Sequence, residues 1–339
     1  MPESALHVAV VLGDPRLPYA YAPGGVFGSE ETRAAADLER ALQELPRFRF
    51  TILDDHGTLH EDLRTARPDL VLNLCDVGFG NVWTRELHVP ALCETLDLPY
   101  TGAGPVGIVL SNDKELMAAA ARARGVLVPR QELVDVRAEP LPLPSFYPTL
   151  VKPNVSGGSA GITERSLVHD EAEARACLEE LRPVLHSPEV LYQEYLPGRE
   201  LTVGLLGNPR EKLLVLPPLE VDYGGLEGDL PPILTHGSKA DPSSPYWNAL
   251  TFVRAEDVDL DALRDACVAV FERLEFRDYA RFDFRAGADG AWRLIDANIN
   301  PTWVDGGKMA VMASWAGLSY AQMLERILDA ALRRQGIAA

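Results

Sequence analysis

A lysine followed by a loop of small residues is the first group in the sequence that could bind an anion. Lys152 lies at the end of an apolar run, and a few residues later come Ser156, Gly157, Gly158 and Ser159. Glycines let backbone N–H groups approach phosphate oxygens, serine hydroxyls add donors, and the lysine ammonium supplies a point charge. The GxxxxGK[ST] pattern of a P-loop is absent, and a loop of this composition alone is more often an ordinary turn. Other residues must therefore support a phosphate-binding role.

That support comes from polar residues on two segments near the C-terminus. Arg281 and Asp283 alternate with phenylalanines, and Asp296, Asn298 and Asn300 alternate with apolar residues after a Gly-rich turn. Side chains two residues apart lie on one face of a strand, so paired antiparallel strands would gather these groups beside the arginine. Hard oxygen donors suit magnesium, which shares its shell with nucleotide phosphates. A solvated sheet face is the alternative, and the apolar residues opposite make it weaker.

The elements that must position these residues begin with alternating strands and helices. In the first hundred residues, short β-rich runs alternate with helix-like segments, as in βαβ units, and we expect a doubly wound sheet there. Beyond residue 110 the pattern of predicted elements changes to strands on both sides of a helix. A long Gly- and Pro-rich loop follows, and loops of this length are often functional. The predicted strands are 7–12, 50–53, 70–74, 98–102, 148–153, 190–196 and 200–206. The first predicted helix has Ser29 as its N-cap, and the other predicted helices cover 85–96, 111–125 and 171–181. The long loop covers 222–245.

Composition limits the class of protein. At 339 residues the chain is too long for one ordinary core, and 47% apolar with 24% charged residues is typical of compact globular proteins. The net charge of -18 argues against general nucleic-acid binding. Without a leader-like N-terminus or a run of about 20 apolar residues, we expect a cytoplasmic protein with no membrane partner. The cysteines form no CxxC pair and are predicted to be reduced and structural: Cys75, Cys93, Cys177 and Cys267.

In order and spacing, segments along nearly the whole chain resemble the ATP-grasp enzymes of the D-alanine–D-alanine ligase type. The resemblance implies an α/β protein with the ATP-grasp fold, in which two α+β subdomains grip ATP behind an N-terminal doubly wound (pre-ATP-grasp) domain. The implied boundaries are 1–110 for the N-terminal domain, 111–196 for the central subdomain and 197–339 for the C-terminal subdomain. The segments that carry the resemblance are VAVVLG, LPYTG, SNDKELM, LVKPNVSGGSAGI, VLYQEYLPGRELTV, ARFDF, IDANINP and AGLSYAQMLERIL.

The resemblance also implies roles for individual residues at the nucleotide. Phosphates would contact Lys114, Lys152 and the loop from Ser156 through Ser159, adenine would lie against Gln193, Glu194 and Leu196, and Glu200 would hold the ribose. Two magnesium ions, or manganese in their place, would bind Asp283, Asp296 and Asn298. The residues implied in catalysis are Arg281, which would stabilise the oxyanion, Lys152 and Ser159.

The substrate ends of the site depart from the family pattern. Residues 73–80 replace an HGxxGED-like segment, Asp296 stands for a glutamate, and 300–308 replace a Pro-Gly-Met-Thr run. We therefore expect different substrates from D-alanine. The loosest matches concern substrate binding: Glu31 for the first substrate's amine, Lys239 for a substrate contact, and Gly307 with Lys308 for the acceptor's carboxylate.

These inferences predict an ATP-dependent ligase that activates a small-molecule carboxylate as an acyl phosphate and joins it to an amine. An amino acid or small peptide would supply each group, and ADP and phosphate would be released. A carboxylate kinase would use the same ATP apparatus without an amine site, and a catalytically silent nucleotide-binding module is the other alternative. Amine-dependent release of ADP would separate these classes. The substrates' identity and stereochemistry, and the choice between monomer and homodimer, stay open.

Overall fold

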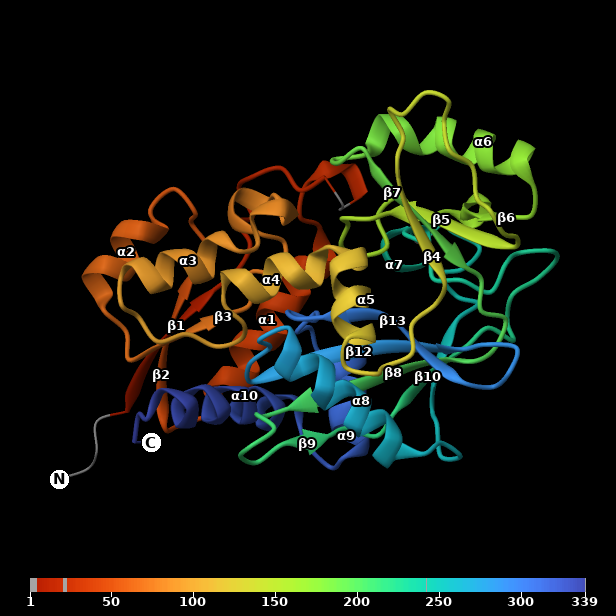
Figure 1. The fold of residues 1–339 in the computed structure, drawn as a ribbon. Coiled ribbons are helices and arrows are strands. Elements are labelled where there is room, and N and C mark those ends of the chain that lie inside the picture. The colour runs from red at the N-terminus through yellow and green to blue at the C-terminus, as the bar shows by residue number, and fades with distance from the viewer. Residues whose placement is uncertain (1–4, 21–22, 242, 339) are drawn as a thin grey trace.

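Three sheets organise the protein. The computed structural model describes residues 5–20, 23–241 and 243–338. Figure 1 shows one group of elements around the β1–β3 sheet, a second around β4–β7 below α6, and a third around β8, β10, β12 and β13. The sheets thus follow one another along the chain. The boundaries at residues 110 and 196 stay predictions, because helices between the sheets pack against more than one group.

The N-terminal sheet is parallel and covered on both faces. Val8 and Val10 of β1 pack in the core that contains α1, whereas Ala9 and Val11 pack with α2 and α3. This alternation is what a doubly wound sheet requires, because both faces of its central strand are buried. The strands β1 (Leu6–Val11), β2 (Phe48–Leu53) and β3 (Leu70–Asn73) lie in the order β2-β1-β3, with helices α1 (Ser29–Gln43), α2 (Leu59–Ala66) and α3 (His88–Thr95).

Several bounds differ from the predicted ones, and the predicted helix at 85–96 is the 3-10 helix η3 (Trp83–Arg85) followed by α3. Helix α1 is capped by Gly28 rather than by Ser29, and the predicted strand at 98–102 is reduced to a single bridge between Tyr100 and Val71. The predicted helix at 111–125 is two helices, α4 (Pro105–Asn112) and α5 (Lys114–Arg122), since Asp113 between them has extended backbone. The Asp113 side chain accepts the N–H of Leu116 and so caps α5 at its N-terminus.

The second sheet presents one face to a helix and the other to the candidate site. Val151 and Tyr192 pack against α6, so their neighbours Lys152 and Gln193 face the opposite way. Helix α6 (Glu171–Leu181) has the predicted bounds, because Asp170 caps its first turn by accepting two backbone N–H groups. The antiparallel strands β4 (Gln131–Asp135), β5 (Thr149–Pro153), β6 (Leu167–Val168) and β7 (Glu189–Glu194) lie in the order β4-β7-β5-β6.

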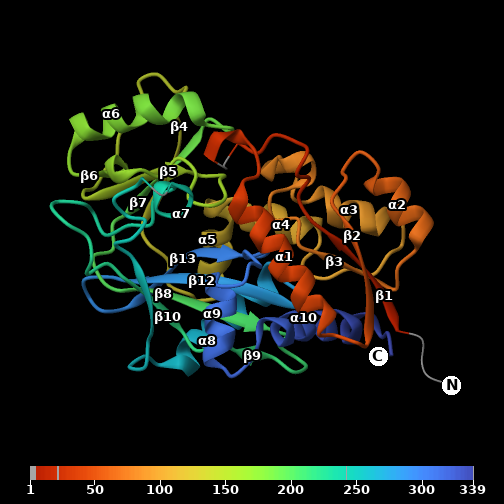
Figure 2. The same cartoon turned by 180° about the vertical axis from the view of Figure 1, so that it is seen from behind.

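The third sheet has six strands and a similar division of faces. Phe282 and Phe284 of β12 pack in the core with α8, so Arg281 and Asp283 point to the other face. Helices α9 and α10 contribute to the core on that other side, and α10 also packs against α1, as Figure 2 shows from behind. The elements are β8 (Glu200–Leu206), β9 (Leu214–Val215), β10 (Leu219–Asp222), β11 (Thr251–Arg254), β12 (Tyr279–Ala286), β13 (Trp292–Asn298), α8 (Leu260–Arg273), α9 (Lys308–Trp315) and α10 (Tyr320–Gln335).

The remaining helices are short. The predicted loop at 222–245 begins on the last residue of β10, holds one of these helices, α7, and has no other helix or strand among the residues that the structure describes there. They are α7 (Gly237–Ala240) and the 3-10 helices η1 (Pro23–Gly25), η2 (Phe79–Asn81), η3 (Trp83–Arg85), η4 (Glu164–Ser166) and η5 (Arg182–Val184). Across the described residues, no helix combines the length and the apolarity that crossing a membrane requires.

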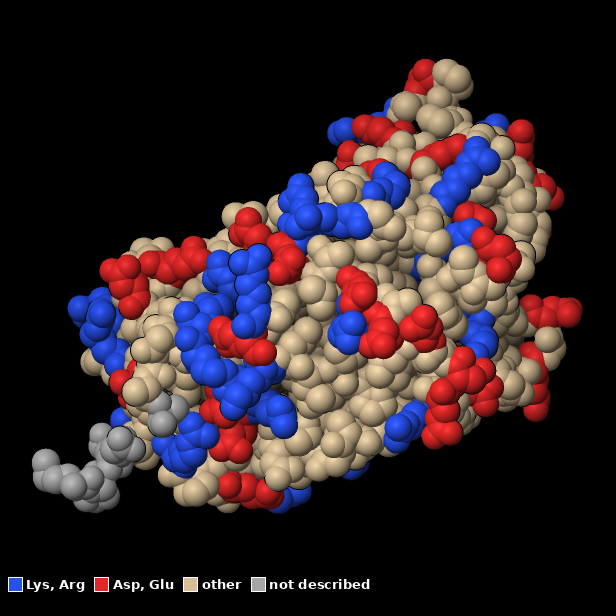
Figure 3. Space-filling view, turned by 60° about the horizontal axis from the view of Figure 1, so that its bottom comes forward, with Lys and Arg blue, Asp and Glu red and all other residues tan. Residues whose placement is uncertain are grey.

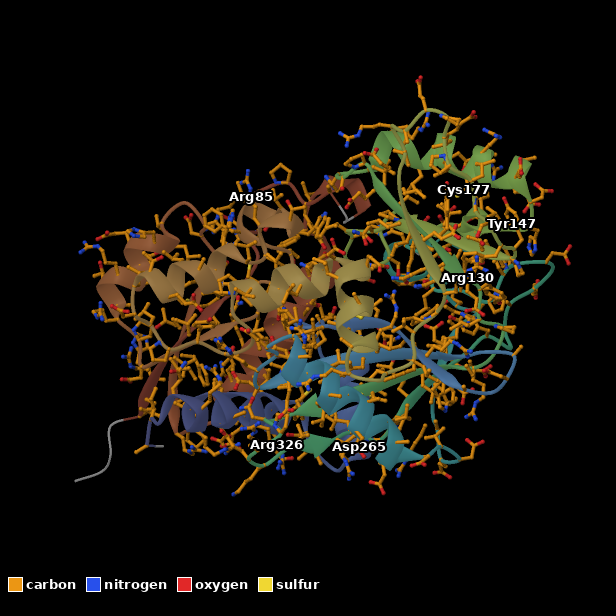
Figure 4. All side chains as sticks on the ribbon, viewed as in Figure 1. Arg85, Arg130, Tyr147, Cys177, Asp265 and Arg326 are labelled. Atoms are coloured by element: carbon orange, nitrogen blue, oxygen red, sulfur yellow. The ribbon has the colours of Figure 1, made fainter. Side chains whose placement is uncertain are left out.

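The cysteines are buried, and the surface carries charges of both signs. All four cysteines are buried and free, and Figure 4 places Cys177 between α6 and its sheet. Burial raises the pKa of the Cys177 thiol to about 11, so the prediction of reduced, structural thiols is confirmed. In Figure 3, Lys and Arg side chains are interspersed with Asp and Glu over the face shown.

Candidate active site

The polar face of β12 and β13 brings the predicted arginine and metal-binding residues together. In the antiparallel register, Arg281 lies opposite Asn298 and Asp283 lies opposite Asp296. Oδ2 of Asp283 accepts hydrogen bonds from Arg281 Nη2 at 3.0 Å and from Asn298 Nδ2 at 2.9 Å. Asn300 lies just beyond β13, where its Oδ1 accepts from the Tyr279 hydroxyl at 2.5 Å. The period-two prediction for this face therefore holds.

Strand β8 and helix α9 complete the surroundings of Asp283. Thr202 Oγ1 donates to Asp283 Oδ1 at 2.6 Å, and the Lys308 ammonium lies 3.8 Å from the same oxygen. Burial alone would raise the pKa of Asp283, but the charges of Arg281 and Lys308 outweigh it and hold that pKa well below its usual range. Asp283 is thus a buried carboxylate that stays ionised because cations surround it.

The second sheet and α5 supply two more cations. Lys152 on β5 is buried and its Nζ donates to Gln193 Oε1 on β7 at 3.0 Å. Lys114, the first residue of α5, donates to the backbone carbonyl of Ser156 at 2.7 Å. Gln193 in turn donates to Gln131 Oε1 at 2.9 Å, which fixes its amide orientation. Lys114, Lys152, Gln193 and the first residue of the small-residue loop therefore lie together.

Lys152 is electrostatically coupled to the third sheet. Burial and the neighbouring charge of Lys114 lower its pKa to about 8, against the opposing effect of the carboxylates of Asp296 and Glu200. Such coupling indicates that Lys152 on the second sheet and these carboxylates on the third sheet lie near one another, because the interaction between two charges weakens with distance. The predicted phosphate and metal residues thus line opposite sides of one site.

Glu200 is held by residues that the sequence analysis did not single out. Arg285 Nη1 donates to Glu200 Oε2 at 3.1 Å, and the Tyr223 hydroxyl donates to the same oxygen at 2.7 Å. The Arg285 guanidinium also lies 5.2 Å from the ring centroid of Tyr195. The period-two alternation that placed Arg281 and Asp283 on one face also includes Arg285, so the signal for it was present.

The chain between the second and third sheets carries the remaining nucleotide residues. Glu194 ends β7, where its carboxylate accepts the backbone N–H of Arg130 at 3.1 Å. Leu196 is buried. Arg130 itself lies over the Phe146 ring, at the edge of the sheet shown in Figure 4.

The small-residue loop is shaped by positive backbone angles and contacts from two sides. Ser159 has φ 63° and Gly158 has φ 58°, so the backbone turns sharply between the flanking residues. A side chain at Gly161 would meet the Pro153 ring at 2.7 Å, which restricts that position to glycine. The 222–245 loop reaches this segment, where the His236 N–H donates to the Ile162 carbonyl at 3.0 Å.

The predicted substrate residues occupy varied positions. Glu31 caps its own helix, accepting the N–H of Gly28 at 2.7 Å. Gly307 is the N-cap of α9, and Lys308 begins that helix with its ammonium donating to Thr202 Oγ1 at 3.0 Å. Lys239 belongs to α7, and its side chain lies outside the described residues. Their roles toward a substrate stay predictions.

Two carboxylates of the first domain, the half-buried Asp76 and the buried Glu86, were not among the predicted site residues. Burial raises the pKa of Asp76 to about 6 and that of Glu86 to about 7. Trp303 and Asn300, from the segment after β13, act against these shifts, and Asn112 Nδ2 donates to Glu86 Oε2 at 3.0 Å. Both acids lie in irregular segments, where no periodic pattern signals a shared site.

The donor set at β12 and β13 fits a magnesium ion. Asp283, Asp296 and the Asn298 amide are oxygen ligands of the kind that magnesium takes alongside phosphates and water. Among the described residues, no group of three or more His, Cys, Asp or Glu is placed to hold a metal by itself. Any ion here would therefore depend on the nucleotide for part of its coordination shell.

Comparisons with known proteins agree with this arrangement. Residues 141–329 match the family described as D-ala D-ala ligase C-terminus. The chain is 31% identical over 315 residues to a D-alanine–D-alanine ligase of Syntrophotalea carbinolica, covering 92% of this chain and 95% of that one. It is also 31% identical over 314 residues to the uncharacterized protein y4sG of Sinorhizobium fredii, covering 89% and 88%. The chain belongs to the D-alanine–D-alanine ligase family.

This membership confirms the predicted enzyme class, an ATP-dependent carboxylate–amine ligase. The solved structure of the D-alanine–D-alanine ligase from Bacillus anthracis, complexed with ATP, aligns with a TM-score of 0.72 at 18% identity and covers 98% of this chain and 99% of that one. The ATP-grasp fold predicted for this D-alanine–D-alanine ligase-like protein is therefore confirmed.

Proposed function

We propose that this ligase joins the carboxylate of an amino acid or small peptide to an amine, with ATP as the energy source and ADP and phosphate as products. One observation carries the proposal. The ammonium groups of Lys114 and Lys152 lie on one side of the site, and Asp296, Asp283 and Arg281 lie on the other. Phosphoryl transfer relies on this kind of fixed charge placement, since positioning and electrostatics supply most of the catalysis.

Nucleotide binding is assigned to the seam between the second and third sheets. Gln193, Glu194 and Leu196 would receive adenine, and Glu200 would accept from the ribose hydroxyls. Arg285 and Tyr223 already hold one Glu200 oxygen, so the other keeps a fixed orientation. Lys114, Lys152 and residues 156–159 would surround the phosphates.

Asp283, Asp296 and Asn298 would hold magnesium, or manganese in its place. When bound, the metal neutralises phosphate charge and orients the transferred group. The protein's own cations add to that effect, because Lys152 is buried in a site where its charge is poorly screened.

The reaction begins when an oxygen of the substrate carboxylate attacks the γ-phosphorus of ATP, forming an acyl phosphate and ADP. The amine then attacks the acyl carbon, the oxyanion collapses and phosphate leaves with one carboxylate oxygen. Arg281 is the residue placed to stabilise that oxyanion. Its Nε is buried and, within the described part of the chain, has no hydrogen-bond partner, so a donor is available for a ligand.

Water must be excluded while the acyl phosphate exists. Residues 156–161, including Ser159, and the 222–245 loop are proposed as the covering segments. The contact between His236 and Ile162 shows that the two meet in the described structure. A covered site also strengthens the electrostatic effects on which the transfer depends.

The substrate ends are proposed on weaker geometry. Glu31 would hold the first substrate's amine, and Lys239 and Gly307 the acceptor. We place the reaction in the cytoplasm, with domain boundaries at residues 110 and 196. Assembly as a monomer or a homodimer is a matter for measurement in solution.

An ADP-release screen tests the proposal. Pairs of D- and L-amino acids and short peptides are incubated with ATP and magnesium, and products are identified by mass spectrometry. We expect ADP release that requires both a carboxylate and an amine, with one new amide per ADP. Release that is independent of the amine would assign the protein to the carboxylate kinases instead.

A further inference from the structure

The side chain of Lys308 turns toward the strands that carry the metal-binding residues. Its Nζ donates to Thr202 Oγ1 on β8 at 3.0 Å and lies 3.8 Å from Asp283 Oδ1 on β12. The side chain is 11% exposed, so water contributes little to the solvation of its charge. The sequence pattern had suggested a contact with the acceptor's carboxylate, whereas these contacts are with the phosphate-transfer side of the site.

Thr202 links the ammonium to the carboxylate. Its hydroxyl donates to Asp283 Oδ1 at 2.6 Å and accepts from Lys308 at 3.0 Å, so one oxygen joins both charges. The ring centroid of Phe252 lies 5.7 Å from the ammonium on another side. A buried ammonium needs such partners, and three groups from β8, β11 and β12 supply them.

Both oxygens of Asp283 are engaged by the protein. Oδ1 faces Thr202 and Lys308, and Oδ2 accepts from Arg281 and Asn298. Among the described residues, by contrast, the side chain of the neighbouring Asp296 makes no hydrogen bond or ion pair. One carboxylate of the pair is therefore committed to protein cations, and the other is free for a metal ion.

We propose that the Lys308 ammonium is a fixed cation of the phosphate-transfer centre and takes the place of a second divalent ion. The inference rests on the proposed function. A divalent ion bound to Asp283 Oδ1 would lie about 2 Å from that oxygen. It would then be within a few Å of the ammonium, where like charges repel strongly. One ion, held mainly by Asp296, Asn298 and the nucleotide, fits the remaining donors.

For the reaction, the consequence is that one positive charge at the phosphate-transfer centre belongs to the protein itself, on the Lys308 ammonium. The ammonium supplies one positive charge that does not exchange with solvent. It also adds donors with fixed direction, which a hydrated ion lacks. The ligase would accordingly respond to magnesium with a single binding event at the nucleotide.

Counting bound manganese tests this proposal without turnover. Mn2+ is titrated into the wild-type protein with saturating adenylyl imidodiphosphate, and free Mn2+ is followed by electron paramagnetic resonance. We expect one Mn2+ per nucleotide complex. In Lys308→Met, which keeps the length and removes the charge, we expect a second Mn2+ to bind with at least about tenfold higher affinity than in the wild type.

Lys212→Met is the matched control, because Lys212 is an exposed lysine and its loss should leave the count at one. Two Mn2+ per wild-type complex would overturn the inference, whether or not Lys308→Met folds. An unchanged count in a folded Lys308→Met protein would also overturn it. Failure of the wild type to bind the nucleotide analogue would overturn the proposed function as well, so the two failures are distinguishable.

Discussion

The nucleotide side and the substrate side of this ligase are built in different ways. On the nucleotide side, Lys152, Gln193, Arg281 and Asp283 stand on regular strands and hold one another by hydrogen bonds. In the first domain, which we propose as the substrate side, the carboxylates with raised pKa values stand on irregular segments, Asp76 after β3 and Glu86 after η3.

That difference separates shared chemistry from particular substrates. Strands fix side chains with little freedom, which suits a phosphate transfer that requires precise charge placement. Loops tolerate replacement, which suits the recognition of different carboxylates and amines. We therefore expect substitutions on the two sides to affect different observables, and the predictions below test this separation.

The largest effect is expected for Lys152→Ala on the nucleotide side. Removing a buried ammonium from the phosphate site should abolish turnover and weaken ADP binding by more than about tenfold, the scale of a charge-assisted hydrogen bond. Calorimetry with ADP and the ADP-release assay measure both effects. Lys212→Ala, at an exposed lysine, is the control. Normal ADP binding and turnover in Lys152→Ala would show that the lysine is only a strand-end residue.

Asp283→Asn and Asp296→Asn should differ from each other. Both should raise the magnesium concentration needed for half-maximal turnover, by at least about tenfold for Asp296→Asn. Asp283→Asn should also lower the free energy of unfolding by about 3 kcal/mol, because Arg281 loses a buried ionic partner. Magnesium titrations and denaturant unfolding measure these effects. Unchanged magnesium dependence in both variants would remove the metal assignment.

Glu86→Gln tests the substrate side. Burial raises the pKa of Glu86 from 4.5 to about 7, so the folded state resists ionisation that the unfolded state accepts. Stability is therefore lost as the pH rises from about 4.5 to 7, and stays reduced above that range. The variant should be more stable than the wild type at pH 8 by about 1 to 3 kcal/mol, and equally stable at pH 4.

The same variant should leave ADP affinity unchanged. Glu39→Gln, at an exposed glutamate of α1, should change neither the stability nor its pH dependence. A fall in ADP affinity for Glu86→Gln would contradict the separation of the two sides. An equal stability difference at pH 4 and pH 8 would contradict the assigned ionisation.

The smallest expected effect is the pH dependence of ADP binding. The pKa of Lys152 is lowered to about 8, so its ammonium is present below that pH and lost above it. ADP affinity should be nearly constant from pH 6 to 7 and fall severalfold by pH 9. In Lys152→Arg, whose guanidinium stays charged, the fall should disappear. Calorimetric titrations at fixed ionic strength measure this difference. The same fall in both proteins would assign it to another group.

The sequence predicted the strand-borne part of the site because alternation is a local property. Period two places Arg281 with Asp283, and the register of β12 with β13 then brings in Asp296 and Asn298. The same rule, applied one step further, would have included Arg285. Helix α6 was predicted with its observed bounds because Asp170 is an unambiguous cap.

Contacts between distant segments could not be predicted in this way. Thr202 meets Asp283 and Lys308 only because β8 pairs with β12 and α9 packs beneath them. Asp76 and Glu86 acquire raised pKa values from the burial that the whole fold imposes. The break between α4 and α5 arises at Asp113, whose side chain caps α5, a role that Ser111 and Asn112 just before it suit equally well in the sequence alone.

The central claim is that a carboxylate becomes an acyl phosphate before the amine attacks. A substrate whose carboxylate carries two oxygen-18 atoms tests it directly, with the released phosphate and the product analysed by mass spectrometry. The account predicts that one labelled oxygen appears in phosphate for each amide formed and that the other stays in the amide carbonyl. Unlabelled phosphate, with the second labelled oxygen recovered in the nucleotide or in water, would contradict it.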